Sequence, residues 1–120
     1  MLTGEAEMLS CAKFRHFAII KGVIRILTIY KITCLVNQKV YIGQTSETIE
    51  KRFARHMGYQ KDESDTKFYR AVRKYGKENF IIEAIDFAET QEELDRKEIY
   101  YIHLYDSVKN GYNSNRYRTH

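Results

Sequence analysis

The sequence contains no proline and no tryptophan, and only two of its 120 residues are cysteines. Without proline, no segment has the composition of a stiff linker between domains. Cys11 and Cys34 lack the paired spacing of a zinc site or a disulfide framework. A chain of this length and cysteine content is expected to form one domain that works in a reducing, intracellular setting.

Long apolar runs are also missing. The sequence has no stretch of about 18 apolar residues, so no transmembrane helix is predicted. The longest apolar patch near the start, Phe17–Ile20, is interrupted by Lys21. Glu5 and Glu7 precede this patch, where a signal peptide would have positive charge. We therefore expect neither a membrane partner nor secretion.

What the chain does contain is typical of a folded, basic domain. Hydrophobic residues make up 43% and charged residues 30% of the sequence, which argues against disorder. The net charge is +4 and the pI is about 9.0. This charge suits a polyanionic partner such as DNA, although many basic proteins bind no nucleic acid.

A β-hairpin is predicted in the first half of the chain. The first strand should cover Arg25–Cys34 and the second Lys39–Gln44, joined by a turn near Asn37. Side chains alternate between the faces of a strand, so a loop of two or four residues places Tyr30 and Tyr41 on the same face. Gly43 would lie on that face as well, leaving space that a ligand or another segment could approach.

The other elements follow from apolar periodicity, capping residues and glycine stops. Residues 1–24 could form a short helix, a strand that precedes the sheet or a loose extension, and of these a poorly specified helix, packed or frayed, is expected. After the hairpin, a helix is expected over Glu47–Met57, capped by Thr45 or Ser46, and a second over Thr66–Tyr75, capped near Ser64 or Asp65 and ended by Gly76. A strand over Asn79–Phe87, covered on both faces, and a helix from the capping box Thr90–Glu93 to about Tyr105 complete the expected elements.

Glu98 is the most informative single residue. It falls on the inward stripe of the last helix, four residues after Leu94 and four before Ile102. A carboxylate in that position is costly unless it is paired or bound to a metal. Glu98 is therefore either a salt-bridge partner of a nearby cation or a ligand for a hard divalent ion such as Mg²⁺.

The other polar candidates are weak when each is considered alone. Two of ten tyrosines on one sheet face are commonly packing residues, an arginine and a histidine on a helix are commonly solvated, and an asparagine after glycine is typical of a turn. These candidates are Tyr30, Tyr41, Arg52, His56 and Asn113.

Taken in order, these residues resemble the GIY-YIG nuclease family. Tyr41-Ile42-Gly43 matches the second half of the family signature in full, and Thr28-Ile29-Tyr30 matches the first half except that Thr28 replaces its glycine. Arg52 and His56 follow at RxxxH spacing, and then Glu98 and Asn113. The resemblance covers about residues 28–113, within an expected nuclease domain at 25–120 that follows an extension of unknown role at 1–24.

The resemblance implies an α/β domain of the α+β kind, with a three-stranded antiparallel sheet flanked by helices. It also implies a metal-dependent DNA endonuclease, like those of homing endonucleases, that leaves 5′-phosphate and 3′-hydroxyl ends. A structure-selective repair nuclease, or a non-catalytic nucleic-acid-binding module with the same fold, is the alternative.

The roles implied by the resemblance can be assigned residue by residue. Glu98 would hold one metal ion, either Mg²⁺ or Mn²⁺, and Arg52 would steady the scissile phosphate. Tyr30 or Tyr41 would activate the attacking water with help from His56. Asn113 would support the site by hydrogen bonding.

Basic residues outside this set could contact the DNA backbone, or could form an ordinary mixed surface, since 16 acidic residues offset 20 basic ones. The candidates are Lys51, Arg55, Arg70, Arg73, Lys74, Arg116 and Arg118.

Overall fold

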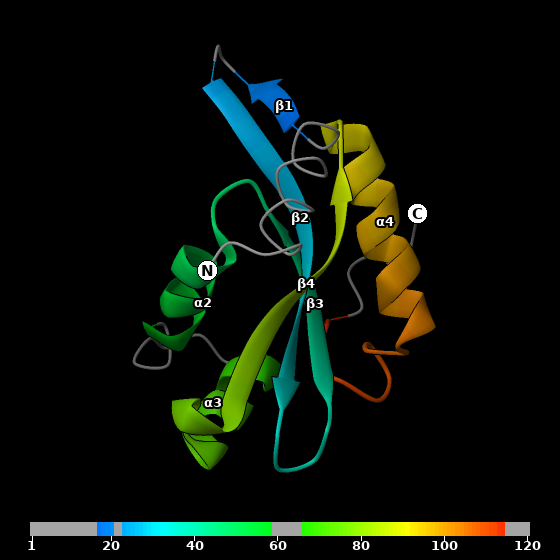
Figure 1. The fold of residues 1–120 in the computed structure, drawn as a ribbon. Helices are drawn as coiled ribbons and strands as arrows, with labels where there is room; N and C mark the ends of the chain where they lie inside the picture. The colour runs from blue at the N-terminus through cyan, green and yellow to red at the C-terminus, as the bar shows by residue number, and fades with distance from the viewer. Residues whose placement is uncertain (1–16, 21–22, 59–65, 115–120) are drawn as a thin grey trace, which may run out of the picture.

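The computed structural model describes residues 17–20, 23–58 and 66–114 of the chain. Arg116 and Arg118 therefore lie outside the described residues. The elements follow one another as β1 (Phe17–Ile20), β2 (Val23–Cys34), β3 (Val40–Thr45), α2 (Ile49–Gly58), α3 (Lys67–Tyr75), the 3₁₀ turn η2 (Lys77–Asn79), β4 (Phe80–Ala88) and α4 (Gln91–Leu104) (Figure 1).

Strand β2 is the centre of the sheet and runs antiparallel to β3 on one side and to β4 on the other. Tyr30 lies opposite Gly43, and Ile32 lies opposite Tyr41. This register corresponds to the predicted loop of four residues, here 35–38, and it puts both tyrosines and the glycine on one face. The predicted three-stranded antiparallel sheet is thus confirmed.

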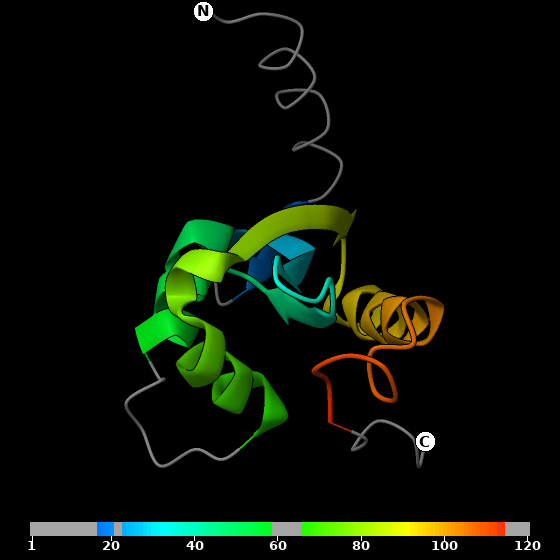
Figure 2. The ribbon, with the colours of Figure 1, turned by 90° about the horizontal axis from the view of Figure 1, so that it is seen from below.

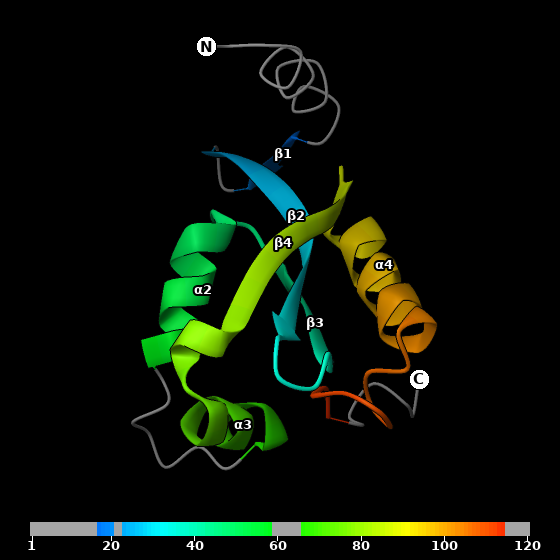
Figure 3. The same cartoon turned by 60° about the horizontal axis from the view of Figure 1, so that its bottom comes forward.

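The helices are divided between the two faces of this sheet. Figures 2 and 3 show α2 and α3 on one side and α4 on the other. The side chains of β2 alternate accordingly: Tyr30 and Ile32 pack with Phe68 of α3, whereas Leu27 and Ile29 pack with the buried residues of α4. The domain therefore has two small cores that share one sheet.

The expected helix within 1–24 is wrong for the part of it that the structure describes. Residues 17–20 form β1, which pairs antiparallel with the first residues of β2, so that β2 begins at Val23 rather than at Arg25. Ile19, Ile20 and Ile24 are β-branched, and such residues favour strands over helices.

Two helix starts also differ from the predictions. Helix α2 is capped by Thr48, whose hydroxyl accepts the N–H of Lys51, while the predicted Thr45 accepts the N–H of Glu47 in the preceding turn. Helix α3 is capped by Thr66. In each case the last threonine before the apolar stripe takes the cap position, which satisfies a backbone N–H of the first turn.

Strand β4 is less covered than expected. It pairs with β2 alone among the described strands, and Ile81 is 48% exposed. The apolar composition of both faces therefore predicted the strand correctly and its burial incorrectly.

Helix α4 begins at the predicted cap Thr90, but Glu93 accepts the N–H of Glu89 instead of closing the capping box on Thr90.

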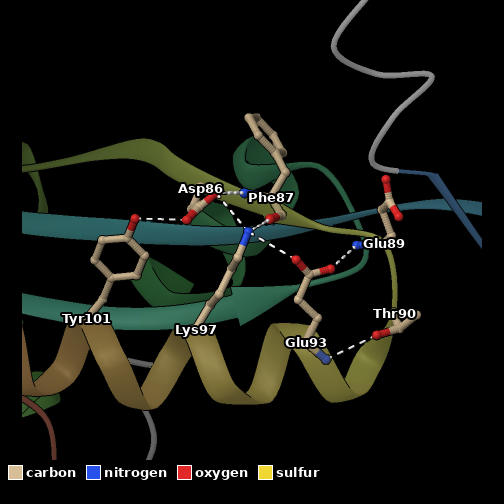
Figure 4. Close-up of polar contacts among 7 residues, drawn as sticks. All are labelled: Asp86, Phe87, Glu89, Thr90, Glu93, Lys97 and Tyr101. Carbon is tan, nitrogen blue, oxygen red and sulfur yellow. Dashed lines mark hydrogen bonds and ion pairs between the residues drawn. The ribbon is translucent and has the colours of Figure 1, made fainter.

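Helix α4 is fastened to β4 by one polar network (Figure 4). Lys97 Nζ lies 3.2 Å from Asp86 Oδ1, 3.3 Å from Glu93 Oε2 and 2.6 Å from the carbonyl oxygen of Phe87. Tyr101 donates a hydrogen bond to the other Asp86 oxygen, and this bond, together with burial, raises the pKa of Tyr101 to about 12. These contacts fix the rotation of α4.

The segment after α4 closes the free edge of β3. Tyr112 donates its backbone N–H to the carbonyl of Val40. The side-chain amide of Asn113 both accepts from the N–H and donates to the carbonyl of Ile42, each over 2.8 Å. A Cβ on Gly111 would lie 2.5 Å from the carbonyl oxygen of Val40, so this close approach requires glycine. An edge that would otherwise be open is thus paired.

Candidate active site

The hydroxyl group of Tyr30 is the centre of the candidate site. Tyr30 is fully buried, and its ring lies where a Cβ on Gly43 would be, 2.4 Å from the ring carbon Cζ and the hydroxyl oxygen. The space that the sequence predicted at Gly43 is therefore filled by Tyr30, the tyrosine from the first half of the signature.

The family signature has a glycine where this chain has Thr28. This difference leaves the strand intact, since Thr28 is buried and pairs with Thr45 and Phe87.

Helix α2 brings two cationic or titratable groups to this hydroxyl. Arg52 Nε donates a hydrogen bond to Tyr30 over 3.3 Å, and His56 Nε2 lies 2.7 Å from the same oxygen. The two residues are one helical turn apart, so they share a face. That face is next to the stripe of Ile49, Phe53 and Met57, which packs on the core as predicted.

Aromatic rings enclose His56. Its ring centroid is 5.3 Å from those of Tyr41 and Phe68 and 5.9 Å from that of Tyr69, and its other nitrogen, Nδ1, is 2.8 Å from the Tyr69 hydroxyl. Burial first, and then the charges of Arg52 and Arg55, lower its pKa to about 4. The imidazole is therefore neutral at pH 7.

Burial, and then the nearby Tyr41, raise the pKa of the Tyr30 phenol far above its ordinary value, although the hydrogen bond from Arg52 lowers it. An isolated phenolate is thus unfavourable here. Tyr41 is less buried than Tyr30, and its ring is stacked on Phe68 at a centroid distance of 4.6 Å. The two tyrosines differ in environment although they share a face.

Glu98 lies on α4 and is 6% exposed, as its position on the inward stripe predicted. The side-chain amide of Gln44 donates to Glu98 Oε1 over 3.0 Å and to Asp95 Oδ1 over 2.9 Å, so two carboxylates meet one N–H₂ group. The charge of Glu98 also adds to the rise in the pKa of Tyr30, a rise that burial dominates. Glu98 and Tyr30 thus lie on opposite faces of the sheet, with Glu98 on α4 and Tyr30 packed against α3.

A hard divalent ion fits this donor set on chemical grounds. The described residues contain no group of three or more His, Cys, Asp or Glu side chains that could hold a metal by themselves. Mg²⁺ is commonly held by one or two carboxylates and completes its shell with water and phosphate oxygen atoms. Glu98 would supply such a carboxylate, and Asp95 is a second carboxylate bound to the same Gln44 amide.

Asn113 lies at the edge of β3. Its two hydrogen bonds hold the backbone of Ile42, the residue between Tyr41 and Gly43. It therefore fixes the backbone between the two signature residues of β3, and its supporting role in the reaction stays a prediction.

A cleft of about 830 Å³ opens beside these residues, and Tyr41, Arg52, His56, Tyr69 and Asn113 line it. The other charged or titratable residues that line it are Lys67, Arg70, His103, Asp106, Lys109 and Tyr112. Positive groups thus outnumber the single carboxylate, and the cleft suits a polyanion.

Of the predicted backbone-binding residues, Arg70 lines the cleft. Arg55 is paired with Glu47 over 2.8 Å, and Lys51, Arg73 and Lys74 are exposed outside the cleft lining. Sequence reasoning missed Lys67 and Lys109. Lys67 is three residues before Arg70 on the same helix face, so helical spacing could have identified it, whereas Lys109 lies in an irregular segment that gives no such signal.

Comparisons with known proteins agree with this geometry. The sequence pattern of the GIY-YIG catalytic domain matches residues 27–113. Two solved structures of the catalytic domain of the endonuclease I-TevI are similar, one described as an intron endonuclease in mutant form and the other as a homing endonuclease. Each has 26% sequence identity and a TM-score of 0.65 over 73% of this chain, and the alignments cover 92% and 97% of the two I-TevI chains.

No match was found among the curated proteins. None of the helices in the described part of the chain is long and apolar enough to cross a membrane.

The contact between Gly43 and Tyr30 predicts a steric effect. Gly43→Ala should displace the buried ring, break its hydrogen bonds and lower the free energy of unfolding by about 1–3 kcal/mol. Gly58→Ala is the control, because a Cβ there has no atom within 4 Å; it should change stability by less than about 1 kcal/mol. Urea unfolding of both variants measures this, and equal stabilities would contradict the packing described here.

The low pKa of His56 predicts acid sensitivity. The unfolded chain takes up a proton near pH 6.5 that the folded protein binds only near pH 4, so stability is unaffected above pH 6.5 and falls below it. The free energy of unfolding should fall by about 2 kcal/mol from pH 7.5 to pH 5. His56→Gln should remove most of this slope and His103→Gln should keep it. Equal slopes in wild type and His56→Gln would refute the prediction.

Proposed function

The chain belongs to the GIY-YIG family of nuclease catalytic domains, and from this premise we propose that it is a metal-dependent DNA endonuclease of the homing-endonuclease type. The observation that supports the proposal most is the buried Tyr30 hydroxyl, bonded to both Arg52 and His56 beside a basic cleft. The products are a 5′-phosphate and a 3′-hydroxyl end.

Arg52 binds the scissile phosphate in this proposal. Its Nε is engaged with Tyr30, while Nη1 and Nη2 have no hydrogen-bond partner among the described residues, and the side chain lines the cleft. A guanidinium group remains charged at all working pH values and can bind two phosphate oxygen atoms at once. Arg52 is thus held from one side and offers its other two nitrogen atoms to the negative charge that develops during attack.

Tyr30 and His56 handle the proton of the attacking water. The phenol of Tyr30 is not a base by itself, because burial disfavours its anion. It can take a proton from water only as its own proton moves to His56 Nε2, which is neutral and 2.7 Å away. Tyr41, which lines the cleft, orients the water or the phosphate.

Glu98 would hold the metal ion, with Mg²⁺ as the first candidate and Mn²⁺ as the second. A bound ion supplies charge stabilisation for the phosphate and the leaving oxygen. Glu98 is held in place by Gln44, and the network of Lys97 fixes the helix on which it lies.

We place the activity inside the cell, with the DNA of the cytoplasm, nucleoid or nucleus, where the free thiol of Cys34 is expected to remain reduced.

Cleavage of supercoiled plasmid in Mg²⁺ or Mn²⁺ tests this function. The wild-type protein should nick or linearise the plasmid, and EDTA should abolish the reaction. Glu98→Gln keeps an oxygen atom for Gln44 but loses the charge, so the rate should fall by more than about 100-fold. Glu92→Gln, an exposed residue of the same helix, should cleave at the wild-type rate.

Wild-type cleavage that persists in Glu98→Gln would overturn the metal assignment. Absence of cleavage by the wild type, with salt-sensitive DNA binding intact, would favour the non-catalytic binding module instead.

The basic cleft predicts where the DNA backbone lies. Lys109→Met should weaken binding of a DNA duplex several-fold and reduce the slope of log K against log salt by about 1, because one phosphate contact is lost. Lys74→Met removes the same charge from the exposed side of α3 and should change neither quantity. Fluorescence anisotropy over a salt series measures both variants, and a larger effect at Lys74 would place the DNA elsewhere.

A further inference from the structure

The second ring nitrogen of His56 has a partner that the roles described above do not use. His56 Nδ1 lies 2.8 Å from the hydroxyl of Tyr69 on α3, while Nε2 lies 2.7 Å from that of Tyr30 on β2. The imidazole is 2% exposed and neutral at pH 7. It therefore has one N–H and one lone pair, and it must donate to one phenol and accept from the other.

The direction of these bonds follows from the surroundings of Tyr30. Its hydroxyl has two hydrogen-bond partners among the described residues, Arg52 Nε and His56 Nε2. Arginine can only donate. The buried O–H of Tyr30 therefore finds its acceptor in Nε2, which must be unprotonated. The ring proton is then on Nδ1, and Nδ1 donates it to the oxygen of Tyr69.

We infer that Tyr69 is a positioning residue of this nuclease: its hydroxyl oxygen accepts the N–H of His56 Nδ1 and thereby keeps the bare Nε2 lone pair directed at the hydroxyl of Tyr30. The inference rests on the proposed function, in which Nε2 must be free to receive the Tyr30 proton. It adds a third residue, from a different helix, to the pair of Tyr30 and His56.

The energetic reason is the cost of a buried, unpaired donor. Without the Tyr69 oxygen, an N–H at Nδ1 would lose its hydrogen bond inside the aromatic enclosure. A buried donor without an acceptor is unfavourable, so the tautomer with the proton on Nδ1 would lose its advantage. The proton would then move to Nε2, where it would face the Tyr30 oxygen and remove the acceptor. The rings of Tyr41 and Phe68 still enclose the imidazole in that case. The Tyr69 hydroxyl, rather than its ring, therefore sets the tautomer.

The test compares Tyr69→Phe with Tyr75→Phe in the full chain. Both variants remove one phenolic hydroxyl from α3, and both rings pack on the same core, but Tyr75 does not line the cleft. Single-turnover nicking of supercoiled plasmid in Mg²⁺ gives a rate at saturating protein and a half-saturating protein concentration. Tyr69→Phe should lower the saturating rate about 10- to 100-fold and change the half-saturating concentration by less than about twofold.

Tyr75→Phe should leave both quantities at the wild-type value. A wild-type saturating rate in Tyr69→Phe would overturn the inference. So would a loss of rate that is equal in the two variants, because that would be a general effect of removing a hydroxyl from the helix.

A second readout does not depend on catalysis. Two-bond ¹H–¹⁵N correlation spectra of the imidazole rings show which nitrogen of His56 has the proton. The wild type and Tyr75→Phe should have it on Nδ1, and Tyr69→Phe should have it wholly or partly on Nε2. A wild-type proton on Nε2, or an unchanged Nδ1 proton in Tyr69→Phe, would contradict the inference.

The two readouts separate this inference from the proposed function. If the wild type cleaves DNA and Tyr69→Phe cleaves equally well, the positioning role fails and the nuclease assignment stands. If the wild type does not cleave but the tautomer changes as expected, the nuclease assignment fails and the hydrogen-bond direction stands.

Discussion

The buried hydroxyl of Tyr30 is the interaction on which the candidate site depends. It lies on the central strand, in space that is open because residue 43 has no side chain, and it bonds to Arg52 and His56 from a helix that packs on the same face. A buried polar group is stable only if it is hydrogen-bonded. The requirement that holds the tyrosine in place therefore also orients the arginine and the histidine, so folding and assembly of the site are one event.

The opposite face of the sheet contributes Glu98, and the edge of β3 is held by Asn113, which also lines the cleft. Glu98 is positioned by α4, whose rotation is fixed by the contacts of Lys97 with β4 (Figure 4), and Asn113 fixes the backbone of Ile42 between the two signature residues of β3. The two cores are small, but β2 contributes side chains to both of them, and so does the neighbouring strand β3. A nuclease site built in this way needs few side chains because rigid elements hold each of them.

The sequence predicted most of this arrangement, for identifiable physical reasons. Strand alternation placed both tyrosines on one face, and helical spacing placed Arg52 next to His56 and Glu98 on the inward stripe. It did not predict that Tyr30 itself fills the space at Gly43, nor the contact of Tyr69 with His56, because both depend on how α2 and α3 pack. Local patterns define the faces of elements, whereas partners between elements depend on tertiary packing. The misplaced helix caps arose because several adjacent threonines and serines could each cap a helix.

The most direct test of the central claim is a double-mutant cycle on plasmid cleavage with Tyr30→Phe and His56→Gln. If the two residues act as one proton-handling unit, the double variant should be no slower than the slower single variant, because removing either already disables the unit. Independent effects, in which the two losses of rate multiply in the double variant, would contradict the account and separate the tyrosine from the histidine in the mechanism.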